Sequence, residues 1–144
     1  MRSWHSRVAS SGLTLVDANV LLDIATDAPS WADWSIAAVT DAARTGGVAI
    51  NPIVYAELSA GYDRVEECDD AFPSSLYARL DLPWEAAFLA GKVFVAYRRS
   101  RGEKRSPLPD FYIGAHAAVA GMRLLTRDPR RYRTYFPKLE LISP

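Results

Sequence analysis

The chain has little cysteine and histidine, and it lacks long apolar runs. Its 144 residues include one cysteine, Cys68, and two histidines, His5 and His116. A single cysteine cannot form an internal disulfide or a cysteine-rich zinc site. The longest apolar run is far shorter than the ~20 residues that cross a bilayer, and the first residues lack the apolar core of a secretory signal. We therefore expect a cytoplasmic protein without membrane contact, whose chemistry depends on carboxylates and other oxygen donors.

The chain also lacks net charge, because 17 Lys and Arg residues balance 17 Asp and Glu residues. The two signs are unevenly distributed. Residues 1–90 hold five basic and 13 acidic residues, whereas residues 91–144 hold 12 basic and four acidic residues. Such asymmetry hints at a polyanionic partner for the basic part of the chain.

The remaining composition is that of one ordinary domain. Hydrophobic residues make up 49% of the chain and charged residues 24%, which excludes wholesale disorder and fibrous repeats. No repeat or long Pro/Gly/Ser linker divides the sequence. We expect a polar amino-terminal extension over residues 1–12, to which we assign no role, and a single domain over residues 13–144.

Short apolar runs alternate with helical patterns along this domain. Strands are predicted at residues 13–16, 48–50, 123–126 and 139–143. One helix is predicted from residue 19, and a second follows a cap at Ser30 and stops at Gly46. A third begins at Asn51–Pro52. Further helices are predicted over residues 84–102, 110–121 and 128–136. A further helical stretch is expected, interrupted at Pro73 and Pro83. The alternation predicts an α/β fold with a short, mostly parallel sheet covered on both faces.

Four acidic residues are expected at the carboxyl edge of this sheet, where open α/β folds place their functional crevice. Asp17 ends the first predicted strand and Asp128 follows the third. Asp110 opens a helix, and Glu57 lies about one and a half turns into another. Two carboxylates ~4 Å apart repel by about 4 kcal/mol at an effective dielectric of ~20, so converging acids need compensation. Mg²⁺ or Mn²⁺, which prefer oxygen ligands, would supply it.

The chemistry expected of such a site is metal-assisted hydrolysis of a phosphodiester. Asn19 and Thr126 are polar neighbours of Asp17 and Asp128. They are expected to orient a carboxylate or to hold a metal-bound water.

Four segments together are similar to a known family: LVDANVLLD, NPIVYAEL, LPDFYIGAHAAVAG and LLTRDPRRYRTYFPKLELISP. In this order they resemble the PIN-domain family, most closely the VapC toxins of bacterial toxin–antitoxin pairs, over residues 13–144. The resemblance implies a three-layer α/β/α fold, a Mg²⁺- or Mn²⁺-dependent ribonuclease, a homodimer, and a cognate antitoxin that covers the active site.

The resemblance also assigns roles to residues of this sequence. Asp17, Glu57, Asp110 and Asp128 match the acidic quartet of the family, and Asp17 and Asp110 are expected to be the direct metal ligands. Asn19 and Thr126 match its accessory polar positions.

Two basic clusters are candidates for contact with RNA phosphates, which provide most of the affinity in such complexes. Arg99 and Arg101 belong to the cluster that closes the long helix, and Arg127, Arg130 and Arg131 belong to the cluster that flanks Asp128. Tyr132 and Tyr135 are expected to pack against the sheet, with base stacking as the alternative.

These features favour an endoribonuclease acting on single-stranded or looped RNA. Two other functions stay open. One is an aspartyl-phosphate enzyme that uses Asp17, although no lysine follows an apolar strand as a partner. The other is a non-catalytic module for RNA binding or protein interaction, whose acids are structural caps.

Overall fold

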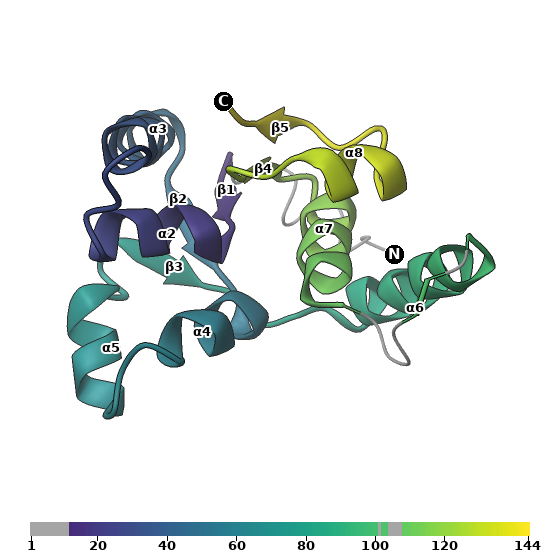
Figure 1. Cartoon of the computed structure of the whole chain (residues 1–144), viewed down its shortest axis with the longest axis horizontal. Coiled ribbons are helices and arrows are strands. Elements are labelled where there is room, and N and C mark those ends of the chain that lie inside the picture. The colour runs from purple at the N-terminus through teal and green to yellow at the C-terminus, as the bar shows by residue number, and fades with distance from the viewer. Residues whose placement is uncertain (1–11, 101, 104–107) are drawn as a thin grey trace, which may run out of the picture.

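The computed structural model describes residues 12–100, 102–103 and 108–144, and five short strands form the centre of this part (Figure 1). They are β1 (Thr14–Val16), β2 (Val48–Ile50), β3 (Tyr77–Arg79), β4 (Arg123–Leu125) and β5 (Leu141–Ile142). Their order in the sheet is β3-β2-β1-β4-β5, and every neighbouring pair is parallel. All five carboxyl ends therefore lie at one edge of the sheet.

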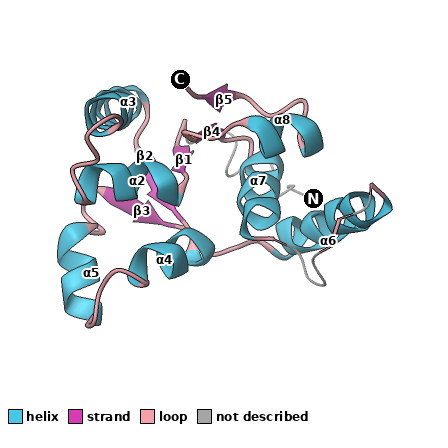
Figure 2. Cartoon of the chain, in the orientation of Figure 1, coloured by secondary structure: helices cyan, strands magenta, loops and turns pink. Residues whose placement is uncertain are grey.

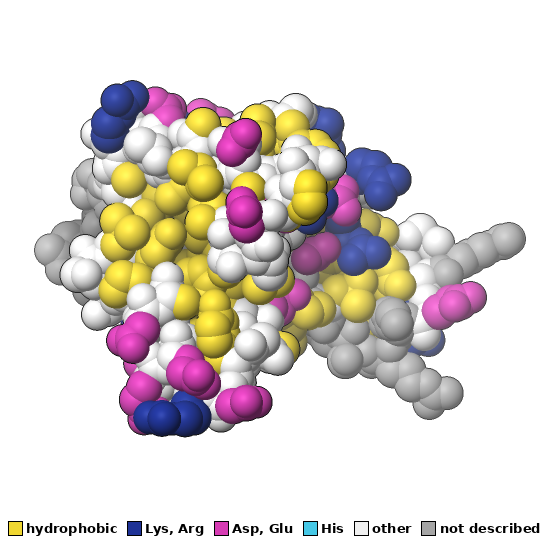
Figure 3. All heavy atoms as spheres, turned by 60° about the vertical axis from the view of Figure 1, so that its left-hand side comes forward, with side chains coloured by type: hydrophobic (Ala, Val, Ile, Leu, Met, Phe, Trp, Pro, Cys, Tyr) yellow, Lys and Arg dark blue, Asp and Glu magenta, His cyan; other side chains and the backbone are white. Residues whose placement is uncertain are grey.

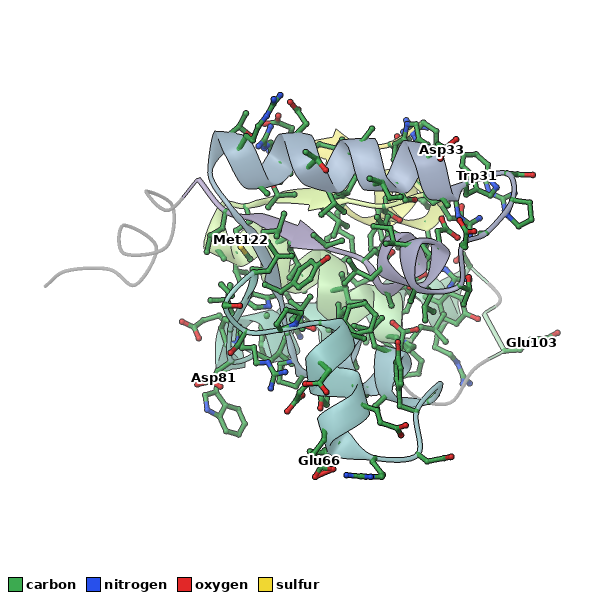
Figure 4. All side chains as sticks on the ribbon, turned by 90° about the vertical axis from the view of Figure 1, so that its left-hand side faces the viewer. Trp31, Asp33, Glu66, Asp81, Glu103 and Met122 are labelled. Carbon is green, nitrogen blue, oxygen red and sulfur yellow. The ribbon has the colours of Figure 1, made fainter. Side chains whose placement is uncertain are left out.

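Helices connect the strands and cover the sheet. They are α2 (Ala18–Ala25), α3 (Ala32–Thr45), α4 (Pro52–Ser59), α5 (Val65–Ala71), α6 (Trp84–Arg99), α7 (Pro109–Ala120) and α8 (Arg130–Tyr135). Helix α3 lies on one side of the sheet, and α4, α5 and α7 lie on the other (Figures 2 and 4). The three-layer α/β/α arrangement predicted from the sequence is confirmed.

Local sequence explains why the central elements form. Every residue of β1 and β2 is buried, as is typical of parallel strands covered on both faces. Asn51 caps α4, because its Oδ1 accepts a hydrogen bond of 2.9 Å from the Val54 amide, and Pro52 occupies the first turn. Helix α7 begins at Pro109, and its C-cap is Gly121, which adopts the left-handed conformation with φ 68°.

Three predictions about secondary structure were wrong in detail. The stretch between Pro73 and Pro83 contains the edge strand β3 instead of a helix, and the helix before it, α5, ends at Ala71. Ser30 does not cap α3, because Trp31 occupies the N-cap position and makes no capping hydrogen bond with its side chain. Helix α6 ends at Arg99, earlier than Gly102.

Two other expectations concern the amino-terminal extension and membrane-spanning helices. Almost all of the predicted extension, residues 1–11, lies outside the described residues, so its role stays unassigned. Across the described ranges, no helix has both the length and the apolar character that a membrane span requires.

Candidate active site

The strand order identifies one special position at the carboxyl edge. Going outward from β1, the chain continues to β2 and β3 on one side and to β4 and β5 on the other, so the connections change direction between β1 and β4. Ligands of open α/β sheets bind in the crevice at such a switch point. Asp17 directly follows β1, and Thr126 directly follows β4.

Asp17 is held firmly at this point, with only 5% of its surface exposed. Its Oδ1 accepts a hydrogen bond of 2.8 Å from the Ala18 amide, which caps α2. Its Oδ2 accepts hydrogen bonds of 2.9 Å from the hydroxyls of Thr126 and Tyr132. Burial raises the pKa of Asp17, the hydrogen bonds from Thr126 and Tyr132 oppose this rise, and the charge of Asp110 adds to it.

Asp110 reaches the same place from the first turn of α7. Its Oδ1 lies 3.4 Å from the hydroxyl of Tyr132, the group that also donates to Asp17. One hydroxyl therefore contacts both carboxylates. The structure thus brings together the two residues that were predicted as direct metal ligands.

Glu57 joins them electrostatically from α4. Its pKa is raised to about 7, first by partial desolvation of the carboxyl group and then by the charges of Asp17 and Asp110. Negative charges raise the pKa of a carboxyl group in this way only when they lie close to it. The structure therefore brings together three members of the predicted quartet.

The donor set fits a small divalent cation. In the part of the chain that the structure describes, one basic side chain contacts this trio: Arg131, whose guanidinium lies 3.3 Å from Oδ2 of Asp110. Three carboxylates with one exposed arginine leave an excess of negative charge, and their oxygens are the ligands that Mg²⁺ and Mn²⁺ prefer. No three Asp, Glu, His or Cys side chains among the described residues are already close enough to enclose an ion.

Asp128, the fourth predicted acid, lies at the rim of the site. Its side chain is 59% exposed and lies 3.5 Å from the guanidinium of Arg130. Asp110 and Asp128 both line an open groove of about 390 Å³, whose other walls are Tyr97, Arg130, Arg131, Thr134 and Tyr135. The groove leads directly from the acids to the basic side chains of α8.

The arginines predicted to bind RNA differ in their surroundings. Arg130 has an 89% exposed side chain and Arg131 a 43% exposed one, and both line the groove. Arg127 instead forms a 2.7 Å ion pair with the buried Asp23. Arg99 is exposed at the end of α6, and Arg101 lies outside the described residues. RNA contact by these residues stays a prediction.

The accessory residues link β1 to the loop after β4. The Asn19 Nδ2 lies 3.5 Å from Asp17 and 3.4 Å from the Thr126 hydroxyl. Its Oδ1 accepts a hydrogen bond of 3.1 Å from the Arg127 amide. Asn19 and Thr126 therefore hold the two loops of the switch point against each other. That they orient a carboxylate or hold a metal-bound water stays a prediction.

His116 is a structural side chain inside α7. Only 2% of its surface is exposed, and its Nδ1 lies 3.0 Å from the Nδ2 of Asn51. Desolvation lowers its pKa to about 4, so the imidazole is neutral near pH 7. The contact with Asn51 links α7 to the N-cap of α4.

Two residues of the site were not identified from the sequence. Tyr132 was expected only to pack or stack, and the sequence carries no marker of a buried, paired role for Asp23. Buried tyrosines usually find a hydrogen-bond partner, but the partner depends on the fold. Asp23 accepts hydrogen bonds from Ser35 and Arg127, which lie 12 and 104 residues away, and no local pattern indicates these pairings.

The fold and the acidic site define a class of protein, and comparison with known families agrees. The PIN domain family matches residues 14–137, which is most of the chain. The chain belongs to the PIN domain family.

Solved structures with the same fold come from bacterial protein pairs. VapBC2 from Rickettsia felis, bound to a DNA fragment from the pair's promoter, is similar with a TM-score of 0.72 and 19% identity over 92% of this chain and 98% of that chain. VapBC-1 from nontypeable Haemophilus influenzae is similar with a TM-score of 0.68 and 15% identity over 91% and 97%. FitAcB from Neisseria gonorrhoeae is similar with a TM-score of 0.63 and 19% identity over 90% and 96%. At these identities the likeness shows the fold. None of the curated protein sequences compared with the chain matches it.

Proposed function

We propose that the chain is a VapC-type toxin, a Mg²⁺- or Mn²⁺-dependent endoribonuclease that cleaves single-stranded or looped RNA. The observation that carries the proposal is the convergence of Asp17 and Asp110 on one tyrosine hydroxyl, with Glu57 close enough for their charges to add to the desolvation that raises its pKa. The PIN family match and the VapBC structures support it.

Asp17 and Asp110 are the residues that would hold the ion. When bound, Mg²⁺ or Mn²⁺ lowers the pKa of water and stabilises negative charge on a phosphate. Glu57, with a pKa of about 7, is suited to accept a proton from the attacking water near neutral pH. Asp128 at the rim would orient the water or a substrate hydroxyl.

The groove beside the acids would hold the RNA strand. Arg130 and Arg131 line it and project from α8, so phosphates next to the scissile bond can contact them while the bond lies over Asp110. Arginine can grip a phosphate with two parallel hydrogen bonds. Arg99, at the end of α6, would add a further phosphate contact.

A cognate antitoxin and a second copy of the chain are the proposed protein partners. Apolar side chains gather between α3 and α5 on the face shown in Figure 3, and the acidic side chains of α5 lie below them. Such a surface suits a basic, amphipathic antitoxin segment. Helix α6 exposes Trp84 at 89% and Phe88 at 69%, which favours it as the dimer contact. We also propose that the protein acts in the cytoplasm, where its RNA substrate lies.

The test is cleavage of a structured RNA with Mg²⁺, with and without EDTA, by the wild type, Asp17→Asn and Asp110→Asn. We expect EDTA or either substitution to reduce the rate by at least about 100-fold, because each removes transition-state stabilisation that only the ion-bound acids provide. Asp41→Asn is the matched control, since Asp41 is an exposed residue of α3 with the same change in charge.

Two results would contradict the proposal. Full activity in both site variants would remove the catalytic assignment. RNA binding that EDTA does not affect, with intact substrate after long incubation, would favour the non-catalytic module instead.

A further inference from the structure

Tyr132 places a single hydroxyl between two carboxylates that come from different elements. The residue lies in α8 and is 1% exposed. Its hydroxyl is 2.9 Å from Oδ2 of Asp17, which follows β1, and 3.4 Å from Oδ1 of Asp110 in α7. The hydroxyl has one proton, so it donates to one acid at a time. It is therefore a link between the strand edge and α7 at the centre of the site.

This link is electrically neutral. The group is a phenol hydroxyl, which donates a hydrogen bond without bringing a positive charge. A lysine or arginine in this place would cancel part of the negative charge, whereas the tyrosine holds the acids and leaves that charge available to a cation.

The hydrogen bonds also differ between the oxygens of Asp17. Oδ2 accepts from both Thr126 and Tyr132, so its lone pairs are in use. Oδ1 accepts from the Ala18 amide and, among the described residues, from no other donor. Since a carboxylate oxygen offers two lone pairs, Oδ1 is the Asp17 atom with capacity left for an ion.

We propose that Tyr132 is a positioning residue of the acidic site, whose hydroxyl sets the separation of Asp17 and Asp110 and directs Oδ1 of Asp17 toward a divalent cation. The inference rests on the proposed function, because it concerns the same acids. A merely structural role differs in its consequences: it would change stability and leave ion affinity unaltered.

The experiment compares the wild type with Tyr132→Phe in the full chain, using calorimetric titration with Mn²⁺. The variant keeps the buried ring and loses only the hydroxyl. We expect Mn²⁺ affinity to fall by about 10-fold or more, as is usual when a partner that orients metal ligands is lost. In RNA cleavage, kcat is expected to fall while KM stays within about twofold, because Tyr132 does not line the groove that is proposed to hold RNA.

Tyr77→Phe is the matched control. Tyr77 is a buried tyrosine of β3, 5% exposed, and its ring packs edge-to-face against Phe72, a contact that phenylalanine preserves. The control is expected to bind Mn²⁺ and to cleave RNA like the wild type.

Folded Tyr132→Phe with wild-type Mn²⁺ affinity would overturn the inference. If the variant does not fold, a crystal structure of the Mn²⁺-loaded wild type decides: the inference requires the hydroxyl within hydrogen-bond distance of both acids, and displacement from either one overturns it. Failure of the proposed function has a different signature, because tyrosine-dependent Mn²⁺ binding without RNA cleavage would refute the nuclease and keep the positioning role. A wild type that binds no Mn²⁺ would refute both.

Discussion

The pKa of Glu57 shows the repulsion between the acids of the site. Its folded-state pKa of about 7 exceeds the ordinary value of 4.5, because the charged form is partly desolvated and faces Asp17 and Asp110. A raised pKa means that the protonated carboxyl is the form that folding favours. Its contribution to stability is therefore fully present below pH 4.5 and is lost as the pH rises through 7.

Replacing Glu57 by glutamine should reveal how much the ionised carboxylate destabilises the metal-free protein. At pH 8 we expect the free energy of unfolding of Glu57→Gln to exceed that of the wild type by about 1 kcal/mol. The difference is no larger because solvent screens part of the repulsion at this exposed residue. At pH 5 the two proteins should differ little. Urea unfolding at both pH values, in EDTA, measures the difference.

Excess Mg²⁺ provides the control for that comparison. An ion held by the acids stabilises the wild type more than the variant, so the order at pH 8 should reverse. A glutamine variant that is less stable than the wild type at pH 8 in EDTA would contradict the account.

Sequence alone could place the acids of the site and Thr126, which donates to Asp17, but it could not place Tyr132. Asp17 and Asp110 each sit at a recognisable boundary, the end of an apolar strand and the start of a helix, so their convergence follows from a parallel sheet. Tyr132 and Asp23 have no such marker, because their partners are set by the packing of α8 and α3 against the rest of the fold.

At the scale of elements, the packing of α7 against the segment that ends α8 depends on one glycine. A Cβ built at Gly114 would lie 2.4 Å from the ring of Phe136, which is 6% exposed. Helix α7 carries Asp110 and α8 carries Tyr132, so this close contact holds together two elements of the site.

Gly114→Ala is expected to destabilise the protein by about 1–3 kcal/mol, because the ring must move within a packed core. Gly91→Ala in α6 is the matched control, since a Cβ there meets no atom within 4 Å. Alanine is the better helix former, so this second change should stabilise by up to about 1 kcal/mol. Denaturant unfolding of both variants tests the pair, and equal effects would contradict the packing argument.

The missed strand β3 shows why the sheet was only partly predictable. Its three residues, Tyr77–Arg79, have no apolar run and become less buried along the strand. It forms because β2 offers an open edge, to which Tyr77 pairs opposite Val48. The central strands are apolar and can be predicted from their own sequence, whereas this edge strand forms by pairing with β2.

At the scale of the whole molecule, the acidic and basic parts of the chain meet at the site. Asp23, from the acidic part, pairs with Arg127, from the basic part, so some of the charge asymmetry seen in the sequence is neutralised within the fold. Arg130 pairs only loosely, at 3.5 Å, with Asp128, and its side chain is 89% exposed. It is therefore well placed to contact an RNA phosphate.

Arg130→Gln should weaken RNA binding and reduce its dependence on salt. Loss of one phosphate contact on a single strand lowers the slope of log affinity against log salt by about 0.7. Arg44→Gln, at the carboxyl-terminal end of α3, changes the net charge equally and is expected to leave the slope unchanged. Fluorescence anisotropy over a range of salt concentrations, with the Asp17→Asn background to prevent cleavage, measures both. Equal slopes for the two variants would show that charge acts without a defined contact.

The central claim is that the acids at the carboxyl edge converge in order to hold a divalent cation. Anomalous scattering from crystals soaked in Mn²⁺ tests it most directly. The account predicts one strong peak about 2 Å from carboxylate oxygens of Asp17 and Asp110, the distance at which small divalent cations bind oxygen. A well-occupied Mn²⁺ elsewhere, with these two carboxylates bound to no ion at saturating concentration, would contradict it.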